Sequence, residues 1–264
     1  MIKLIATDID GTLIKESTSD LYPEMIKVIK ALLKQGMIFC SASGRQYPSL
    51  RNVFCDLDED IVYIAENGAQ IRYKEKDISL IPMKRAYVEE LICQLRKYYK
   101  HCDIIVSTPD GSLLETHNKE FIDLMTFGYR NKFKLVGDIL EEKTEIIKVA
   151  IYQKESIREL GEEILIPQWK DKLKACMSGE EWVDFMDSSV DKRHAIAFLQ
   201  DYFGVSKEET MVFGDNNNDI GMLQAAGESY AVENAREEVR KAAKHICPSY
   251  LEKGVYQVLK NLII

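Results

Sequence analysis

Ile2-Lys3-Leu4-Ile5-Ala6-Thr7 followed by Asp8-Ile9-Asp10-Gly11-Thr12 carries most of the information about the fold. Residues 2–7 form a short, largely apolar run, which predicts a strand buried on both faces, as parallel strands usually are. Gly11 gives the backbone the freedom for a sharp turn directly after this strand. We therefore predict a parallel sheet whose first strand has two carboxylates, Asp8 and Asp10, at its carboxyl end.

The residues that follow alternate between helix and strand patterns. Pro23 begins a predicted helix that Gly36 ends, and apolar runs at 37–42 and 61–65 predict two more strands. The alternation returns late in the chain, with a predicted helix at 191–203, strands at 210–213 and 229–232, and two closing helices. This pattern is typical of the α/β class, here a Rossmann-like parallel sheet core with helices on both faces.

The middle of the chain has a different pattern. Apolar runs at 69–73 and 78–82 predict a hairpin. Later segments mix predicted helices at 85–99 and 118–129, a hairpin around Pro109-Asp110-Gly111, and strands at 146–152, 173–178 and 182–187. We expect residues 1–82 and 188–264 to build one sheet, with residues 83–187 inserted between them as a separate α+β domain.

The composition excludes several classes of protein. The chain has 264 residues, and 35 Lys and Arg against 43 Asp and Glu give a formal net charge of −8. Nucleic-acid binders need clustered cations, whereas the mixed-sign run from Arg236 to Lys244 is typical of a solvated helix face. No apolar run approaches the ~18 residues of a membrane span. The six cysteines lack zinc-site spacing, so we expect reduced thiols in a cytoplasmic protein with neither nucleic acid nor a membrane as partner.

Four groups of polar residues stand at or near the ends of predicted strands, where open parallel sheets bind ligands. They are Asp8 with Asp10, Ser43 with Gly44 and Arg45, Lys192, and Gly214-Asp215 with Asn218-Asp219. Phosphoryl transfer needs an aligned nucleophile, a proton donor for the leaving oxygen, and positive charge on the transferred group. Carboxylates from neighbouring strands can also share Mg²⁺, which prefers oxygen ligands. The four groups together therefore point to phosphoryl transfer.

Each group taken alone has a simpler explanation. The stretch from Asp8 to Thr12 is also typical of a turn that ends a strand, and most lysines such as Lys192 are solvated. Residues 214–219 are also typical of an Asx-rich loop that caps the following helix. The phosphoryl-transfer interpretation therefore depends on all four groups occurring in one chain, in an order that allows them to form one site.

The four groups resemble the motifs of the haloacid dehalogenase-like phosphatases, specifically the Cof-like branch with a type IIB cap. Asp8 to Leu13 match the first motif, DxDGT with a following apolar residue, and Ser43 matches the second, where this branch more often has Thr. The remaining matches are Lys192 for the third motif, Gly214, Asp215, Asn218 and Asp219 for GDxxND, and the lesser marks Glu66-Asn67-Gly68-Ala69 and Glu233-Asn234-Ala235. The resemblance covers essentially the whole chain.

The resemblance implies a Mg²⁺-dependent phosphatase that forms a phospho-aspartate. Asp8 is then the nucleophile, and Asp10 first protonates the leaving group and then activates water. Mg²⁺ is expected on the side chains of Asp8 and Asp215 and on the backbone carbonyl of Asp10. The expected phosphate ligands are the Ile9 backbone amide, Ser43, Gly44, Lys192 and Asn218, and the expected supporting residues are Gly11, Thr12, Asp219, Arg45 and Asn67.

The resemblance also makes residues 83–187 a cap that closes over the site and sets substrate specificity. Candidate substrate contacts, each of which can equally belong to the cap core or surface, are Trp182, Tyr129, His117, Asp184 and Met125. We expect the partner to be a small phosphorylated metabolite, with sugar phosphates first and flavin or other cofactor phosphates next. The sequence predicts no oligomeric state.

Two other functions stay open at this point. A phosphomutase of the same superfamily would return the phosphoryl group to a sugar and would need further cations in the cap, for which Arg130 and Lys132 are candidates. A non-enzymatic phospho-aspartate switch of the receiver type lacks a large cap and a second acid two residues after the nucleophile. Asp10 and the long insertion therefore argue against the switch.

Overall fold

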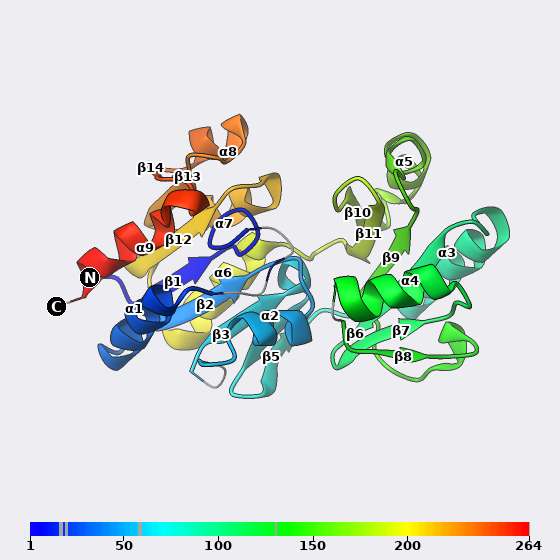
Figure 1. The fold of residues 1–264 in the computed structure, drawn as a ribbon, viewed down its shortest axis with the longest axis horizontal. Helices are drawn as coiled ribbons and strands as arrows, with labels where there is room; N and C mark the ends of the chain where they lie inside the picture. Colours follow the sequence, from blue (N-terminus) through cyan, green and yellow to red (C-terminus); the bar gives the residue numbers. More distant parts are fainter. Residues whose placement is uncertain (16–17, 19–20, 58–59, 130, 264) are drawn as a thin grey trace. The chain divides into compact units, whose positions relative to one another are not determined.

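The computed structural model describes residues 1–15, 18, 21–57, 60–129 and 131–263 (Figure 1). The chain forms two compact units. The first contains Met1–Ser79 together with Asp191–Ile264, and the second contains Leu80–Val190. One inserted segment thus makes up the whole second unit, with borders at 79/80 and 190/191 where the sequence analysis expects 82/83 and 187/188.

An eight-stranded sheet forms the centre of the first unit. Its order is β14-β13-β12-β1-β2-β3-β4-β5, parallel from β14 to β3 and antiparallel between β3 and β4. The strands are β1 (Leu4–Thr7), β2 (Ile38–Ala42), β3 (Val62–Ala65), β4 (Gln70–Tyr73), β5 (Lys76–Leu80), β12 (Thr210–Gly214), β13 (Glu228–Val232) and β14 (His245–Cys247). The prediction of a Rossmann-like, mainly parallel sheet is confirmed.

Helices flank this sheet (Figure 1). They are α1 (Pro23–Lys34), α2 (Tyr47–Val53), α6 (Lys192–Phe203), α7 (Ile220–Ala225), α8 (Glu237–Ala242) and α9 (Gly254–Leu259). Pro23 stands in the first turn of α1, where its missing N–H costs nothing. Asp191 caps α6 by accepting a hydrogen bond from the Arg193 N–H at 2.7 Å, and Gly204 ends that helix in the left-handed conformation. These signals fix where α6 begins, and therefore where its first residue, Lys192, lies.

The second unit is an α+β domain around a six-stranded sheet. Its order is β10-β11-β9-β6-β7-β8, antiparallel throughout except for the parallel pair β7–β8. The elements are α3 (Arg85–Tyr98), β6 (Asp103–Thr108), β7 (Gly111–Leu114), α4 (Lys119–Asp123), β8 (Phe133–Leu135), β9 (Lys148–Tyr152), α5 (Ile166–Trp169), β10 (Leu173–Met177) and β11 (Trp182–Asp187). Val88, Leu91, Ile92 and Leu95 of α3 are buried in one core with Val149, Ile151 and Phe185 of the sheet. The predicted α+β character is confirmed.

The sequence analysis misses the short strands β8 and β14 and a change of helix type within residues 118–129. β8 and β14 have three residues each, and two of the three side chains in each are exposed, so neither forms an apolar run. The helix predicted at 118–129 starts as α4 and continues as a π-helical turn at Leu124–Gly128. The other short helical turns are η1 (Glu66–Gly68), η3 (Ile139–Glu141), η4 (Leu160–Leu165), η5 (Lys207–Glu209), η6 (Asn217–Asp219), η7 (Tyr250–Glu252) and η8 (Lys260–Leu262).

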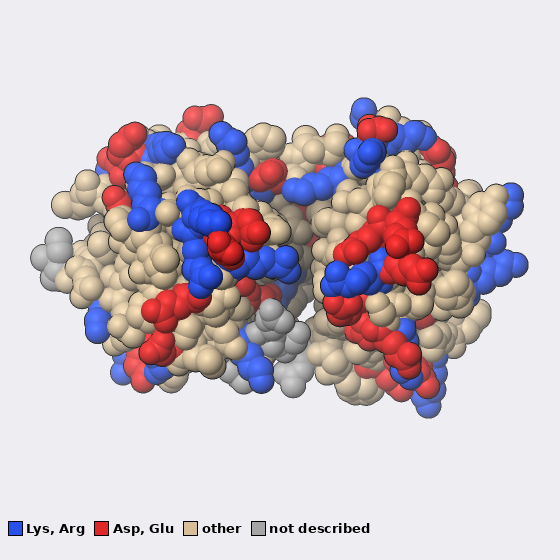
Figure 2. Space-filling model, turned by 90° about the horizontal axis from the view of Figure 1, so that it is seen from above, with Lys and Arg blue, Asp and Glu red and all other residues tan. Residues whose placement is uncertain are grey.

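Helix length and surface charge relate to the predictions that neither a membrane nor nucleic acid is a partner. Among the described residues, no helix combines the length and the apolar character that crossing a bilayer requires. On the face that Figure 2 shows, Lys and Arg side chains of the described residues are mixed with Asp and Glu side chains.

Candidate active site

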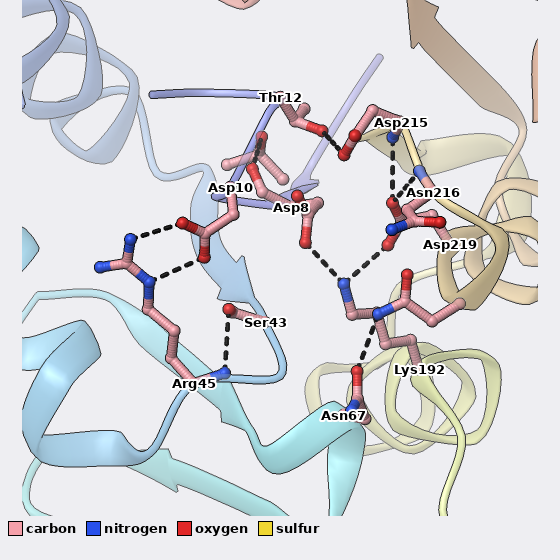
Figure 3. Close-up of polar contacts among 12 residues, drawn as sticks. Asp8, Asp10, Thr12, Ser43, Arg45, Asn67, Lys192, Asp215, Asn216 and Asp219 are labelled. Carbon is pink, nitrogen blue, oxygen red and sulfur yellow. Dashed lines mark hydrogen bonds and ion pairs between the residues drawn. The ribbon is translucent and has the colours of Figure 1, made fainter. Parts of the chain in front are cut away.

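Three neighbouring parallel strands bring three of the motifs to one edge of the sheet (Figure 3). β1 lies between β12 and β2, with Thr7 opposite Phe213 on one side and Ser41 on the other. The Asp8 N–H continues the pairing by donating to the Phe213 carbonyl at 2.9 Å. Asp8, Ser43 and Asp215 therefore follow the carboxyl ends of adjacent strands, where an open parallel sheet binds ligands.

Lys192 is fully buried at the start of α6 and makes two ion pairs. Its Nζ donates to Asp8 Oδ1 at 2.7 Å and to Asp219 Oδ1 at 2.6 Å. Burial opposes the charged form of Lys192, but Asp219 and Asp8 outweigh burial and raise the pKa of this ammonium above its ordinary value. The site thus contains a fixed positive charge in direct contact with Asp8.

Asp219 uses both carboxylate oxygens within the protein. Oδ1 pairs with Lys192, and Oδ2 accepts hydrogen bonds at 3.0 Å from the N–H groups of Asp215 and Asn216. Gly214 is required beside it, because a Cβ on Gly214 would lie 2.5 Å from the Asp219 Cβ. Asp219 therefore ties the loop after β12 to Lys192.

Asp215 is oriented by the first motif. Thr12 Oγ1 donates to Asp215 Oδ1 at 2.7 Å. Gly11 has φ of +83°, and a Cβ there would lie 2.7 Å from Asp215 Oδ2, so the two loops meet closely. Burial raises the pKa of Asp215 to about 6; the Thr12 hydrogen bond lowers it and the Asp219 charge raises it further.

The acidic cluster fits a divalent cation. Oxygens of Asp8, Asp215 and Asp219 lie within 4.8 Å of one another. Burial raises the pKa of Asp8 well above its usual range; Lys192 opposes this shift, while Asp219 and Asp215 add to it. Three carboxylates and one ammonium leave two negative charges uncompensated when all are ionised. Asp8 Oδ2 is buried and has no hydrogen-bond partner among the described residues, so it is available to such an ion.

Asp10 lies outside this cluster and faces a different cation. Arg45 Nε donates to Asp10 Oδ2 at 2.7 Å, and Arg45 Nη2 donates to Asp10 Oδ1. The Arg45 backbone N–H donates to Ser43 Oγ at 3.1 Å. Figure 3 shows the Asp10 side chain turned toward Arg45, whereas Asp8 points toward Lys192. The sequence analysis predicts Arg45 as a supporting residue but misses this forked ion pair, since the pairing depends on loop conformation.

The remaining predicted phosphate ligands lie around the same edge of the sheet. Ser43 is buried after β2, and its N–H donates to the Ile64 carbonyl at 2.9 Å. Ile9 lies in the turn after Asp8, and its carbonyl accepts hydrogen bonds from Leu13 and Ile14 at 3.0 Å. Asn218 Nδ2 donates to Asn67 Oδ1 at 2.8 Å. The structure thus connects Asn218 to Asn67, although 151 residues separate them in the sequence.

Two further residues contact the backbone of the loops that carry the carboxylates, and only one of them has a sequence signal. Asn234 Nδ2 donates to the Gly11 carbonyl at 2.7 Å, and the Arg236 N–H donates to the Asp215 carbonyl at 3.1 Å. Asn234 belongs to the lesser mark Glu233-Asn234-Ala235, while Arg236 has no signal of its own. Both contacts support the turns that carry the carboxylates.

The candidate contacts of the second unit have different environments. Met125 is fully buried in a small core, and His117 is exposed. Trp182 lies 4.7 Å from the Tyr152 ring and donates from Nε1 to Tyr129 Oη at 3.0 Å. Asp184 is buried and pairs with Lys148 at 3.4 Å, a partner that the sequence analysis does not identify. Arg130 lies outside the described residues, and Lys132 is exposed.

Known proteins match this sequence along nearly the full length of the chain. A family model described as haloacid dehalogenase-like hydrolase matches residues 5–259. A 5-amino-6-(5-phospho-D-ribitylamino)uracil phosphatase of Escherichia coli (strain K12) is 27% identical over an alignment of 278 positions, which covers 99% of this chain and 96% of that protein.

Two solved structures are also similar. A structure from Eubacterium rectale is 38% identical with a TM-score of 0.92, and the match covers 99% of each chain. A sugar phosphatase of subclass IIB of the same superfamily is 25% identical with a TM-score of 0.81, and the match covers 99% of this chain and 100% of that one.

Proposed function

The chain belongs to the haloacid dehalogenase-like hydrolases and is a phosphatase of that family, and we propose that it hydrolyses small phosphomonoesters with Mg²⁺ through a phospho-aspartate on Asp8. One observation carries the proposal. Asp8 has one oxygen fixed by Lys192, while its other oxygen is buried, has no hydrogen-bond partner among the described residues and lies in an acidic cluster. A nucleophile needs this combination of fixed orientation and an available oxygen.

The phosphoryl group of the substrate would bind beside Asp8. Lys192 supplies a buried positive charge, and Ser43 and Asn218 supply neutral donors. The described residues bring few cations to the site, so a bound metal ion would be needed to balance the negative charge of the phosphoryl group. When bound, Mg²⁺ would be held by the Asp8 and Asp215 side chains and the Asp10 carbonyl, and it would neutralise charge on the transferred group.

The first half of the reaction transfers the phosphoryl group to the protein. A carboxylate oxygen of Asp8 attacks phosphorus, and the bond from phosphorus to the leaving oxygen breaks. Asp10 donates a proton to that oxygen, so the alcohol leaves neutral. In this structure both Asp10 oxygens accept hydrogen bonds from Arg45. The Asp10 carboxylate must therefore leave Arg45 and take up a proton from solvent before it can donate that proton to the leaving oxygen.

The second half returns the protein to its starting state. Asp10 accepts a proton from water, and the water oxygen attacks phosphorus. The bond between phosphorus and Asp8 breaks, which releases inorganic phosphate and regenerates both carboxyl groups. Splitting the reaction in this way replaces one difficult displacement with two easier ones.

The second unit is proposed to be the cap that determines which substrate is accepted. Sugar phosphates are our first candidate class, because the subclass IIB relative at 25% identity is a sugar phosphatase. The Escherichia coli relative acts on a phosphorylated ribitylaminouracil, which makes flavin-pathway phosphates the second class. Both classes present a phosphorylated polyhydroxy chain, so one panel can compare them.

The test is release of inorganic phosphate from a panel of sugar phosphates and phosphorylated ribityl compounds, with Mg²⁺ and with EDTA. We expect turnover of at least one class with Mg²⁺ and loss of that turnover in EDTA. Activity that persists in EDTA contradicts the metal requirement. An isomeric phosphate as the only product would indicate a phosphomutase, and a long-lived phospho-Asp8 without turnover would indicate a switch.

A further inference from the structure

The turn Glu66–Gly68 (η1) has an unusual backbone. Glu66, Asn67 and Gly68 have φ of 48°, 57° and 106°, three left-handed values in succession. Such values cost a residue with a side chain about 1–3 kcal/mol, and Asn tolerates them better than most. All three residues are buried. A strained, buried turn persists only where its surroundings hold it in place, so its contacts bear on its role.

The first set of contacts joins the turn to the loop after β2. The Asn67 N–H donates to the Ser43 carbonyl at 2.9 Å, and the Glu66 N–H donates to the Arg45 carbonyl at 3.0 Å. A Cβ on Gly44 would lie 3.2 Å from Asn67 Nδ2, so the Asn67 amide fills the space that a side chain there would take. The turn thus fixes the backbone that carries Ser43.

The second set of contacts reaches the loop after β12 and the start of α6. Asn67 Oδ1 accepts the hydrogen bond from Asn218 at 2.8 Å. A Cβ on Gly68 would lie 2.9 Å from the Asp191 carbonyl, so the backbone directly before Lys192 packs against the turn. One turn therefore contacts all three segments that carry Ser43, Lys192 and Asn218.

We propose that the turn Glu66–Gly68, chiefly through Asn67, is a positioning element that sets the relative placement of Ser43, Lys192 and Asn218 and thereby the affinity for the phosphoryl group. This inference rests on the proposed function. In the described part of the chain, Asn67 has no hydrogen bond to Asp8 or Asp215. We therefore expect it to affect phosphate binding without affecting metal binding.

The test compares three variants with the wild-type protein. Asn67→Gly keeps the left-handed backbone and removes the amide. We expect KM and the Kd for orthophosphate, measured calorimetrically with Mg²⁺ present, to rise together. A rise of about five- to tenfold corresponds to the loss of the hydrogen bond from Asn218 to Asn67. The Mg²⁺ concentration for half-maximal activity stays at the wild-type value. Asn217→Ala, at an exposed asparagine beside Asn218, should leave all these quantities unchanged.

Asn67→Asp is the second variant of the turn. It preserves the oxygen that accepts from Asn218 but replaces the nitrogen beside Gly44 with an acceptor, so we again expect weaker orthophosphate binding. Wild-type affinity in Asn67→Gly or in Asn67→Asp overturns the proposal, as does an equal loss of Mg²⁺ affinity. Failure of the proposed function has a different signature, namely a wild-type protein that hydrolyses no phosphomonoester.

Discussion

Two ion pairs hold the two carboxylates of the first motif, and they differ in burial. Lys192, Asp8 and Asp219 have side chains that are 0%, 8% and 0% exposed, whereas those of Arg45 and Asp10 are 14% and 30% exposed. A buried pair cannot exchange partners without leaving an unpaired charge in the interior, whereas a partly exposed pair can open to water. The difference matches the proposed roles, since a nucleophile must be fixed and an acid–base group must change partners.

The largest expected effect is at Asp8, the proposed nucleophile. Asp8→Asn keeps the size of the side chain and removes the attacking carboxylate, so we expect kcat to fall by on the order of 10³-fold or more. Steady-state assays on the best substrate of the panel measure this. The melting temperature of the variant should stay within a few degrees of the wild-type value, which separates lost chemistry from lost folding. Near-normal turnover would exclude Asp8 as the nucleophile.

The next effect concerns the buried pair. Lys192→Met leaves Asp8 and Asp219 without their cation, so we expect the free energy of unfolding to fall by about 3–5 kcal/mol. Urea denaturation measures this difference. Lys241→Met, which breaks an exposed pair with Glu237, is the matched control and should cause no measurable change. Equal stabilities of the two variants would show that burial of Lys192 has no energetic consequence.

The exposed pair should behave in the opposite way. Arg45→Met should change the free energy of unfolding by less than about 1 kcal/mol, because the pair with Asp10 is partly solvated. We expect kcat to fall about tenfold, since Asp10 loses the cation that places its side chain before it moves to the leaving oxygen. Arg45→Lys should recover only part of this loss, because an ammonium cannot form the forked contact. A destabilisation as large as that of Lys192→Met would remove the distinction between the two pairs.

The smallest effect is on stability as a function of pH. In the metal-free protein, burial raises the pKa of Asp8 well above its usual range and that of Asp215 to about 6. These raised values mean that the folded state binds more protons than the unfolded state. The stability that each group contributes is therefore present below the ordinary pKa of 3.8. The Asp215 contribution is lost as pH rises through about 6, and the Asp8 contribution is lost as pH rises through its own raised pKa.

Mg²⁺ should offset this loss, because it binds the ionised carboxylates. We expect Mg²⁺ to raise the melting temperature by a few degrees at pH 8 and by less at pH 5. Thermal melts with Mg²⁺ and with EDTA at both pH values measure the difference. Asp215→Asn should abolish most of it. A Mg²⁺ effect of the same size at both pH values would argue against ionised Asp8 and Asp215 as the ligands.

Much of the fold can be predicted from the sequence because the central strands are buried on both faces. β1, β2 and β12 therefore appear as continuous apolar runs, and the polar residues that follow them mark the ligand-binding edge of the sheet. β8 and β14 are not predictable in this way, because each has three residues with mostly exposed side chains. Their pairing comes from the neighbouring strand rather than from their own pattern.

The candidate site also has parts that the sequence predicts and parts that it does not. The grouping of Asp8, Lys192 and Asp215 follows from strand order and from the start of α6, both of which have sequence signals. The Arg45–Asp10 pair depends on loop conformation, and the contacts of Asn67 depend on a turn with positive φ. Neither conformation can be predicted from a single sequence. The motif Glu66-Asn67-Gly68 marks the turn but does not indicate that the turn contacts three segments that carry proposed phosphate ligands.

The most direct test concerns the covalent step at Asp8. Borohydride reduces an aspartyl phosphate to homoserine. The protein would therefore be quenched in acid during turnover and then treated with borohydride. Trypsin would release the peptide from Leu4 to Lys15, which contains both Asp8 and Asp10, so fragmentation by mass spectrometry can locate the change. We expect homoserine at position 8 only, and only with substrate and Mg²⁺ present. Homoserine at position 10, or an unmodified peptide from protein that is demonstrably turning over, would contradict the proposed mechanism.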